Sequence, residues 1–387
     1  MPTPPTPREA SPAHLEAPFR ADHVGSLLRP AALAALRERC KAGEVDAAAL
    51  AAAEDDAIAE VVRRQRDAGL RSITDGELRR DWWHLDFLGQ LDGVTLAANE
   101  GPKFKIAGQS EQPPIATVTG RVGCSRPIMA AHFAYLKSLT DKLPGTVAKM
   151  TIPSPSMLHL RGGRAAISRS AYADLEAFWA DVAAAYRNAI AYLAEAGCRY
   201  LQLDDVAFAY LCDPKVQATC RANGDDPAAL PRTYARVINA ALAGRPADMR
   251  VTIHTCRGNF KSAWVAEGGY DPVVDAMFST EVDGWFMEFD SARAGGFEPL
   301  ARLKEVSQGV SSRKVVLGLV TTKLGELESK DDLKRRIDEA ARHVPLQQLC
   351  LSPQCGFSST HHGNALSHDD QWRKLERVVE VAEEVWG

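Results

Sequence analysis

Short apolar runs rich in β-branched residues alternate with longer Ala- and Leu-rich segments along most of this chain. Eight runs are typical of strands, at 19–24, 70–74, 146–152, 199–204, 250–255, 285–289, 314–320 and 348–351. Amphipathic helices are predicted between them, most clearly at 46–68, 172–196, 227–243, 330–341 and 370–385. Strand followed by helix eight times over predicts an α/β fold, a (β/α)8 TIM barrel. A doubly wound open sheet is the alternative, because it has the same alternation.

One interval departs from this alternation. Residues 76–145 contain the clusters Gly101-Pro102 and Pro113-Pro114 and a hairpin-like run at 117–122. We therefore predict an insertion after the second strand, over the barrel mouth. Residues 1–17 are rich in Pro and Ala, which predicts a disordered lead-in. Because no linker divides the rest, residues 18–387 are expected to form a single barrel domain.

Composition narrows the functional class. The 387 residues are 45% hydrophobic and 25% charged with a formal charge of −4, which is ordinary for a globular protein and gives no basic footprint for nucleic acid. No apolar stretch approaches the roughly 20 residues of a membrane helix. The first residues lack the apolar core of a signal peptide. The eight cysteines are scattered without a paired framework, so we expect reduced thiols in a cytoplasmic protein.

Four candidate metal ligands follow strand ends. His254 and Cys256 close the fifth run and, two residues apart, point to one face. Glu288 ends the sixth run and Cys355 follows the eighth, so in a barrel all four converge on one mouth. Imidazole, thiolate and carboxylate are the ligands that zinc prefers. Glu281 is a competing candidate, and packing residues with an inert thiol are the plain alternative.

The donor set indicates which chemistry such a zinc site performs. Two thiolates and a carboxylate place three negative charges around a dication, which makes the centre a weak activator of water. The same centre can bind a thiol, lower its pKa and keep it as a thiolate. Alkyl transfer to sulfur is therefore favoured over hydrolysis.

Several motifs together resemble one known family. They are His254-Thr-Cys256, Phe286-Met-Glu-Phe-Asp290, Ser352-Pro-Gln-Cys-Gly356, Asp22-His-Val-Gly-Ser26, Ile73-Thr-Asp-Gly-Glu77 and Leu201-Gln-Leu-Asp-Asp205. The chain from Phe19 onward resembles the cobalamin-independent methionine synthases, specifically their catalytic C-terminal barrel and its short single-barrel bacterial relatives. The resemblance implies a zinc enzyme that passes a methyl group, typically from a methylfolate, to homocysteine to form methionine.

The resemblance also implies a binding site for the amino acid. Val24, Gly25 and Ser26 would hold its carboxylate, and Glu77 and Asp204 would hold its ammonium group and act as the catalytic acids. A simple strand-to-helix turn is the alternative at 24–26. Salt bridging to neighbouring arginines is the alternative for the two acids. Asp205 has the opposite parity and is expected to cap the following helix.

Aromatic and histidine residues near these motifs are weaker candidates. The cluster Trp82-Trp83-His84 can line a pocket or pack a loop against the barrel. His23 is expected to be a hydrogen-bonded structural residue. The pair His361-His362 follows the cysteine loop and could supply a proton donor.

One departure from the family concerns the methyl donor. The long methionine synthases carry a catalytic histidine after the seventh strand, where this chain reads Gly318-Leu-Val-Thr-Thr-Lys-Leu-Gly-Glu326. Lys323 is a candidate substitute or a grip for an anionic group. The donor therefore stays open between a folate and another methyl compound. Alkyl transfer to another thiol such as coenzyme M, with epoxide opening, is an alternative, as is a metal-free barrel. We expect a monomer or homodimer.

Overall fold

Six parallel strands form the main sheet of the computed structural model, which describes residues 13–97, 114–306 and 312–387. The strand order is β10-β9-β8-β7-β6-β5, and each neighbouring pair is parallel. The strands are β5 (Met150–Pro153), β6 (Tyr200–Asp205), β7 (Arg250–Thr255), β8 (Gly284–Glu288), β9 (Lys314–Val320) and β10 (Leu349–Pro353). Parallel neighbours bring their carboxyl ends to one edge of the sheet, which is where most of the predicted site residues lie.

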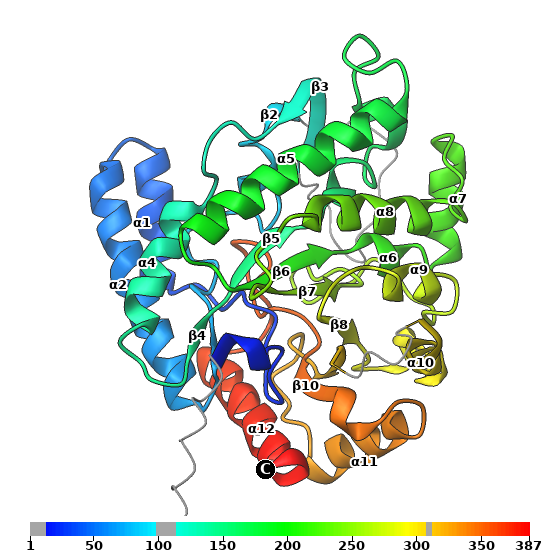
Figure 1. Ribbon diagram of the computed structural model, residues 1–387. Coiled ribbons are helices and arrows are strands. Elements are labelled where there is room, and N and C mark those ends of the chain that lie inside the picture. The colour runs from blue at the N-terminus through cyan, green and yellow to red at the C-terminus, as the bar shows by residue number, and fades with distance from the viewer. Residues whose placement is uncertain (1–12, 98–113, 307–311) are drawn as a thin grey trace, which may run out of the picture.

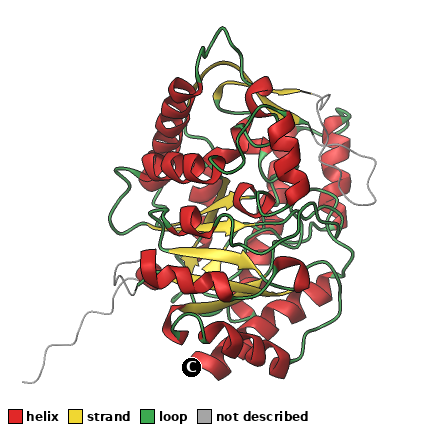
Figure 2. Cartoon of the chain, turned by 90° about the vertical axis from the view of Figure 1, so that its right-hand side faces the viewer, coloured by secondary structure: helices red, strands yellow, loops and turns green. Residues whose placement is uncertain are grey.

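Helices surround these strands, as parallel pairing requires of its crossover connections (Figure 1). In the described residues the α-helices are α1 (Ala31–Lys41), α2 (Ala47–Asp67), α3 (Leu85–Leu88), α4 (Ala130–Thr140), α5 (Leu175–Glu195), α6 (Ala207–Tyr210), α7 (Pro214–Ala222), α8 (Leu230–Leu242), α9 (Val274–Phe278), α10 (Arg302–Val306), α11 (Lys330–Ala341) and α12 (His368–Trp386). Figure 2 shows the strands in the middle of the molecule and the helices outside them.

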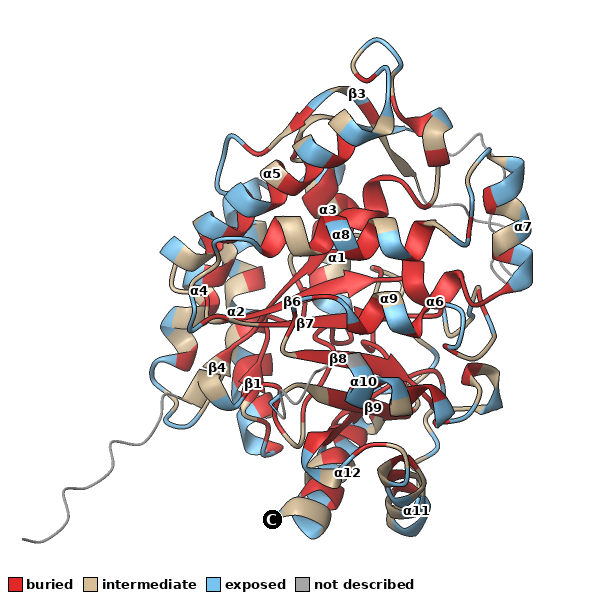
Figure 3. Ribbon diagram, turned by 45° about the vertical axis from the view of Figure 1, so that its right-hand side comes forward, coloured by how far each residue is buried: buried red, intermediate tan, exposed pale blue. Residues whose placement is uncertain are grey.

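The strands β6 to β9 are buried along almost their whole length (Figure 3). Both faces of these strands carry apolar residues, because one face packs against the helices and the other faces the interior of the protein. The helices begin where the sequence supplies caps. The Asp46 side chain accepts from the Ala49 amide at 2.7 Å, and Ser367 and Asp370 form a reciprocal capping box at the start of α12.

The remaining predicted strands are shorter than expected. The run at 146–152 divides at Lys149 into β4 (Val147–Ala148), which pairs with β1 (Ser72–Ile73), and β5, which pairs with β6. The run at 19–24 makes a single parallel bridge, from Ala21 to Leu351. Within the described residues these ladders do not join into one closed sheet. What they show is an α/β fold with a parallel sheet.

The run at 19–24 forms no backbone ladder on the side away from β10, and the side chain of Asp22 explains why. Its carboxylate accepts from the backbone amides of Phe19 at 3.1 Å and His23 at 2.8 Å. It also accepts from the Tyr200 hydroxyl at 2.7 Å and from the Lys149 ammonium at 3.2 Å. Side-chain bonds therefore replace the backbone bonds that a neighbouring strand would make.

The predicted insertion contains a two-stranded antiparallel sheet of β2 (Asp92–Ala97) and β3 (Ile115–Gly123), which lies apart from the main sheet in Figure 1. The cluster Gly101-Pro102 and most of the lead-in lie outside the described residues. The described end of the lead-in is ordered, because 13–16 form a 3-10 helix (Ala13–Glu16) and Ala17 is buried against Phe19 and Tyr200. In the described part of the chain, no helix has both the length and the apolarity to cross a membrane.

Candidate metal centre and substrate cavity

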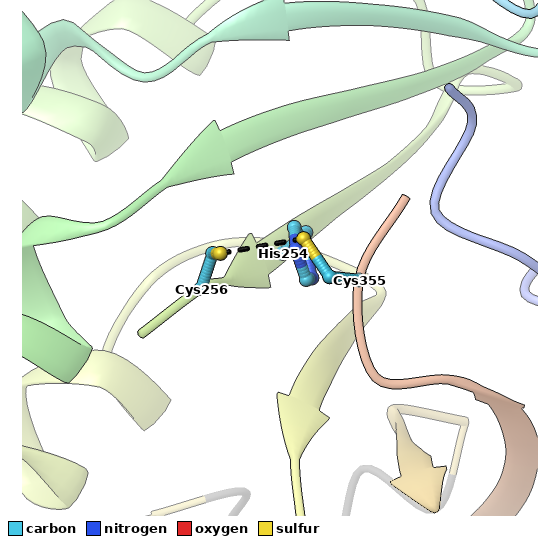
Figure 4. A group of neighbouring side chains, drawn as sticks. All are labelled: His254, Cys256 and Cys355. Atoms are coloured by element: carbon cyan, nitrogen blue, oxygen red, sulfur yellow. Dashed lines mark hydrogen bonds between the residues drawn. The ribbon is translucent and has the colours of Figure 1, made fainter. Parts of the chain in front are cut away.

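Three of the predicted metal ligands meet at the carboxyl ends of the strands (Figure 4). His254 lies in β7, Cys256 directly follows it, and Cys355 follows β10. The candidate ligand atoms of these residues all lie within 4.8 Å of one another, and the two Sγ atoms are 3.3 Å apart. Each side chain is buried. The arrangement matches the expected convergence of strand ends.

The electrostatics of this group favour a cation. Both ring nitrogens of His254 are buried; burial acts to lower the pKa of this imidazole, but its interaction with the Cys355 thiol raises it. The contact between the thiols raises the pKa of Cys256 and lowers that of Cys355, because one deprotonated sulfur disfavours a second beside it. A dication would pair with both thiolates and with an imidazole nitrogen. A buried histidine beside two thiols in contact therefore fits a metal centre.

Glu288 lies at the end of β8 but is engaged elsewhere. Its Oε2 accepts from the backbone amide of Arg257 at 3.0 Å, and its Oε1 pairs with the guanidinium of Arg293. The side chain is fully buried, and burial raises its pKa even though Lys323 and Arg293 act in the opposite direction. The structure thus places Glu288 beside the three-residue group and not within it. Its role as fourth ligand stays a prediction. Glu281, the competing candidate, is exposed and lies before β8.

Lys323 contributes a positive charge to the same region. Its side chain is only 6% exposed, and within 13–97, 114–306 and 312–387 its Nζ has no hydrogen-bond partner. The ammonium lies close enough to lower the pKa of Cys355 and of Glu288. The loop is fixed by Ser262, whose hydroxyl donates to the Lys323 carbonyl at 2.8 Å. Lys323 is therefore a buried cation of the site and not a surface lysine.

A cavity of about 680 Å³ adjoins the metal group and contains both predicted acids. Asp204 is the penultimate residue of β6 and the register partner of His254 on β7. Its Oδ1 accepts from Gln202 at 2.7 Å, whereas Glu77 accepts from the Thr151 hydroxyl at 2.8 Å. Burial and the neighbouring Glu77 raise the pKa of Asp204 to about 7. Two buried acids that line one cavity make a site that a bound ammonium would stabilise.

The backbone at Glu77 supports a functional role for this residue. Its φ of 57° lies in the left-handed region, which is uncommon for a residue with a long side chain. Its amide donates to Asp75 at 2.9 Å, and its Oε2 is buried without a partner among the described residues. Arg80 lies 3.5 Å from Oε1, so the predicted alternative of salt bridging accounts for only part of this carboxylate. Strain of this kind is frequent at binding sites.

The segment 24–26 forms another wall of the cavity, to which Val24 and Ser26 contribute. Gly25 has a φ of +138°, and a Cβ there would come within 2.9 Å of the Thr151 side chain. The Ser26 hydroxyl accepts weakly from the Ser358 amide at 3.4 Å. The segment therefore approaches the acid pair closely, and only a glycine fits at its centre.

The weaker predictions divide between the cavity and the core. Trp82, Trp83 and His84 line the cavity. Asp205 accepts from the Phe208 amide at 3.0 Å, which confirms that it caps α6. His23 is buried, and its Nε2 lies 3.0 Å from the Ser72 carbonyl oxygen, which confirms a hydrogen-bonded structural histidine.

His361 and His362 pack at the rim of the cavity. Their rings meet the edge of Trp82, at centroid distances of 5.6 and 6.0 Å. Trp82 is itself stacked on Phe260 at 6.1 Å. The pair therefore belongs to an aromatic cluster, and its predicted role as proton donor stays a prediction.

Sequence reasoning missed several cavity residues, among them Arg161 and Tyr210. Arg161 follows β5, the third strand of the predicted eight, whose carboxyl end had no candidate assigned to it. In a barrel, functional residues lie at the carboxyl ends of the strands, which is why His254 and Glu288 were predicted. The same rule applies to the carboxyl end of β5. A charged residue in Leu158-His-Leu-Arg-Gly162 was the available signal. Tyr210 is the last residue of α6, the short helix that follows β6 and its predicted acid, Asp204.

Comparison with known proteins gives one family match and several similar chains. Residues 19–384 match the family described as cobalamin-independent synthase, catalytic domain. The uncharacterized protein YxjG of Bacillus subtilis is 47% identical over 373 residues, which cover 95% of each chain. A crystal structure from Listeria monocytogenes, of a candidate vitamin-B12-independent methionine synthase, has a TM-score of 0.75 and 40% identity. The alignment covers 96% of this chain and 99% of that one.

A more distant relative has a named activity. The 5-methyltetrahydropteroyltriglutamate–homocysteine methyltransferase of Shewanella oneidensis is 24% identical over 336 residues. The match covers 87% of this chain and 40% of that protein.

Proposed function

The chain belongs to the family of the cobalamin-independent synthase catalytic domain, and on that premise we propose that it is a zinc-dependent methyltransferase acting on a thiol. Homocysteine is the favoured acceptor and methionine the product. The observation that carries the proposal is the convergence of His254, Cys256 and Cys355 at one end of a cavity that also holds an acid pair. We also infer that the eight strand segments close the (β/α)8 barrel of the family.

The residues present fit a zinc ion. Two thiols and an imidazole in a buried group are a typical zinc donor set, and Glu288 would complete it. When bound, zinc would lower the pKa of an incoming thiol and keep it as a nucleophilic thiolate at neutral pH.

The protein's own residues would orient the amino acid. Glu77 and Asp204 lie in the cavity and would pair with its ammonium group. The segment of Val24, Gly25 and Ser26 would hold its carboxylate, because its backbone comes close to the acid pair. Fixing both ends of the amino acid directs its sulfur toward the metal group, and the buried cavity limits access of water. An acid pair in this position disfavours a thiol with a sulfonate in place of the amino group, as coenzyme M has.

The methyl donor is proposed less narrowly, as a folate or another small methyl compound. Lys323 occupies the loop after β9, where the long relatives carry a histidine. Its buried ammonium would attract an anionic group close to the thiol.

Zinc content in two cysteine variants tests the proposal. We expect one zinc per chain in the native protein and a loss of zinc and of homocysteine methylation in Cys355→Ser. Cys350→Ser is the matched control, because Cys350 is also buried and lies five residues earlier in β10, outside the metal group. A Cys355→Ser variant that keeps stoichiometric zinc and full methylation would refute the assignment.

A further inference from the structure

A second set of polar side chains lines the same cavity, apart from the predicted ligands and acids. It consists of His84, Arg161 and Tyr210. The positive charge of Arg161 lies near enough to His84 to lower the pKa of that imidazole, in addition to the larger effect of burial. Arg161 also lies close to the hydroxyl of Tyr210, where burial raises the pKa and the charge of Arg161 opposes this only in part. The wall therefore carries the positive charge of Arg161 beside two neutral donors, in a cavity whose other ionisable groups include two carboxylates.

Two members of this wall, His84 and Arg161, have nitrogen atoms that lack hydrogen-bond partners in the described residues. His84 is 2% exposed, and neither of its ring nitrogens has a hydrogen-bond partner there. The Nε of Arg161 is likewise buried and unpartnered, and no described carboxylate forms an ion pair with its guanidinium. Buried polar groups without partners are costly, so native proteins rarely keep them without a use.

Arg29, a buried arginine elsewhere in this protein, shows the contrast. Arg29 donates to the carbonyl oxygens of Ser358, Thr360 and Arg80 at 2.7 to 3.0 Å, so its guanidinium serves to hold loops together. Arg161 has no such set of acceptors among the described residues. A structural role therefore does not account for it, whereas a ligand with acceptor oxygens would.

We propose that His84 and Arg161 form a subsite for the anionic group of the second substrate, a methyl donor that carries a carboxylate, sulfonate or phosphate. The proposal rests on the function proposed above. In that assignment the ammonium of homocysteine is taken by Glu77 and Asp204, and its carboxylate by the segment at 24–26. The guanidinium of Arg161 is then left over, and its planar donors match the oxygens of an oxyacid.

The neighbouring ring of Trp83 fixes the imidazole of this subsite. Its centroid lies 4.5 Å from that of His84, with an angle of 39° between the planes. A packed imidazole next to a guanidinium is preorganised, so an anion would bind without rearrangement of His84.

Calorimetric titration of the purified protein with methanesulfonate and with inorganic phosphate tests the subsite. We expect at least one anion to bind, and Arg161→Met to weaken that binding roughly tenfold to hundredfold. Arg161→Lys should keep part of it. Arg169→Met is the matched control, because Arg169 is exposed on the same loop and does not line the cavity. Saturating homocysteine should leave the anion affinity unchanged.

Three results would overturn the proposal. They are an absence of anion binding to the native protein, unchanged binding in Arg161→Met, or competition between the anion and homocysteine, which would assign Arg161 to the amino acid. The unfolding temperature supplies a further readout. Arg161→Met should leave it unchanged or raise it, since a cation without described partners is removed, whereas a structural arginine would lower it. Anion binding requires no thiol chemistry. Its measurement therefore remains informative even if the zinc and homocysteine-methylation test of the proposed function fails.

Discussion

The buried pair of Glu288 and Arg293 provides a test of whether Glu288 is a zinc ligand. Arg293 contacts Oε1 of Glu288 and lies 3.1 Å from Asp290, and the Glu288 side chain is fully buried. Replacing Arg293 by Met leaves that carboxylate with a single described donor, the Arg257 amide. Removing one partner of a buried pair costs about 3–5 kcal/mol. We therefore expect Arg293→Met to lower the free energy of unfolding of the zinc-free protein by about 3 kcal/mol.

Zinc should remove most of this penalty if Glu288 binds it. A bound cation would replace Arg293 as the counter-charge of the carboxylate. Recovery of about 2.8 kcal/mol corresponds to roughly 100-fold tighter zinc binding by the variant. The assay is urea unfolding with and without saturating zinc, together with competition for zinc against a chelator.

Arg302→Met is the matched control for this experiment. Its partner Asp275 is exposed, as is Arg302 itself, so its loss should leave the free energy of unfolding nearly unchanged in either state. Equal destabilisation of Arg293→Met with and without zinc would refute the reasoning, because Glu288 would then keep Arg293 as its partner in the metal-bound protein.

Three further predictions follow from buried groups near the cavity. Burial lowers the pKa of His23 to about 4 from its ordinary 6.5, so the unfolded chain binds the proton more tightly and stability should fall by about 3 kcal/mol as pH falls from 6.5 to 4. His23→Gln should flatten this dependence in urea unfolding at a series of pH values, and an unchanged slope would contradict it. Asp204→Asn should weaken homocysteine binding roughly tenfold to hundredfold in calorimetry while zinc per chain stays constant. If the variant and the native protein bound homocysteine with equal affinity, Asp204 would not be part of the amino-acid site. Gly25→Ala, whose Cβ would press on the residue that binds Glu77, should raise the KM for homocysteine several-fold, and an unchanged KM would show that the segment does not adjoin the amino acid.

The regular elements of the fold could be predicted because their patterns are local. The helix expected at 330–341 coincides with α11, and the run at 250–255 coincides with β7. Apolar periodicity and helix caps decide these elements within a few residues of sequence. The run at 19–24 failed as a strand because its fate depends on Asp22, whose carboxylate binds Tyr200 and Lys149 from distant segments. Such contacts leave no local signal.

The candidate site shows the same division. The rule that functional residues follow strand ends located His254, Cys256 and Cys355, and the structure brings them together. The pairing of Glu288 with Arg293 could not be predicted, since Arg293 lies beyond the end of the strand and any of several arginines was available. Arg161 was missed because its interest lies in the lack of a partner among the described residues, which only coordinates reveal.

X-ray absorption at the zinc edge, with and without homocysteine, tests the central claim most directly. The account predicts one zinc per chain bound by two sulfur atoms of the protein, Cys256 and Cys355, and a third sulfur in the coordination shell after homocysteine is added. A protein that binds no zinc, or a shell whose sulfur count does not change with homocysteine, would contradict thiol activation as the function of this site.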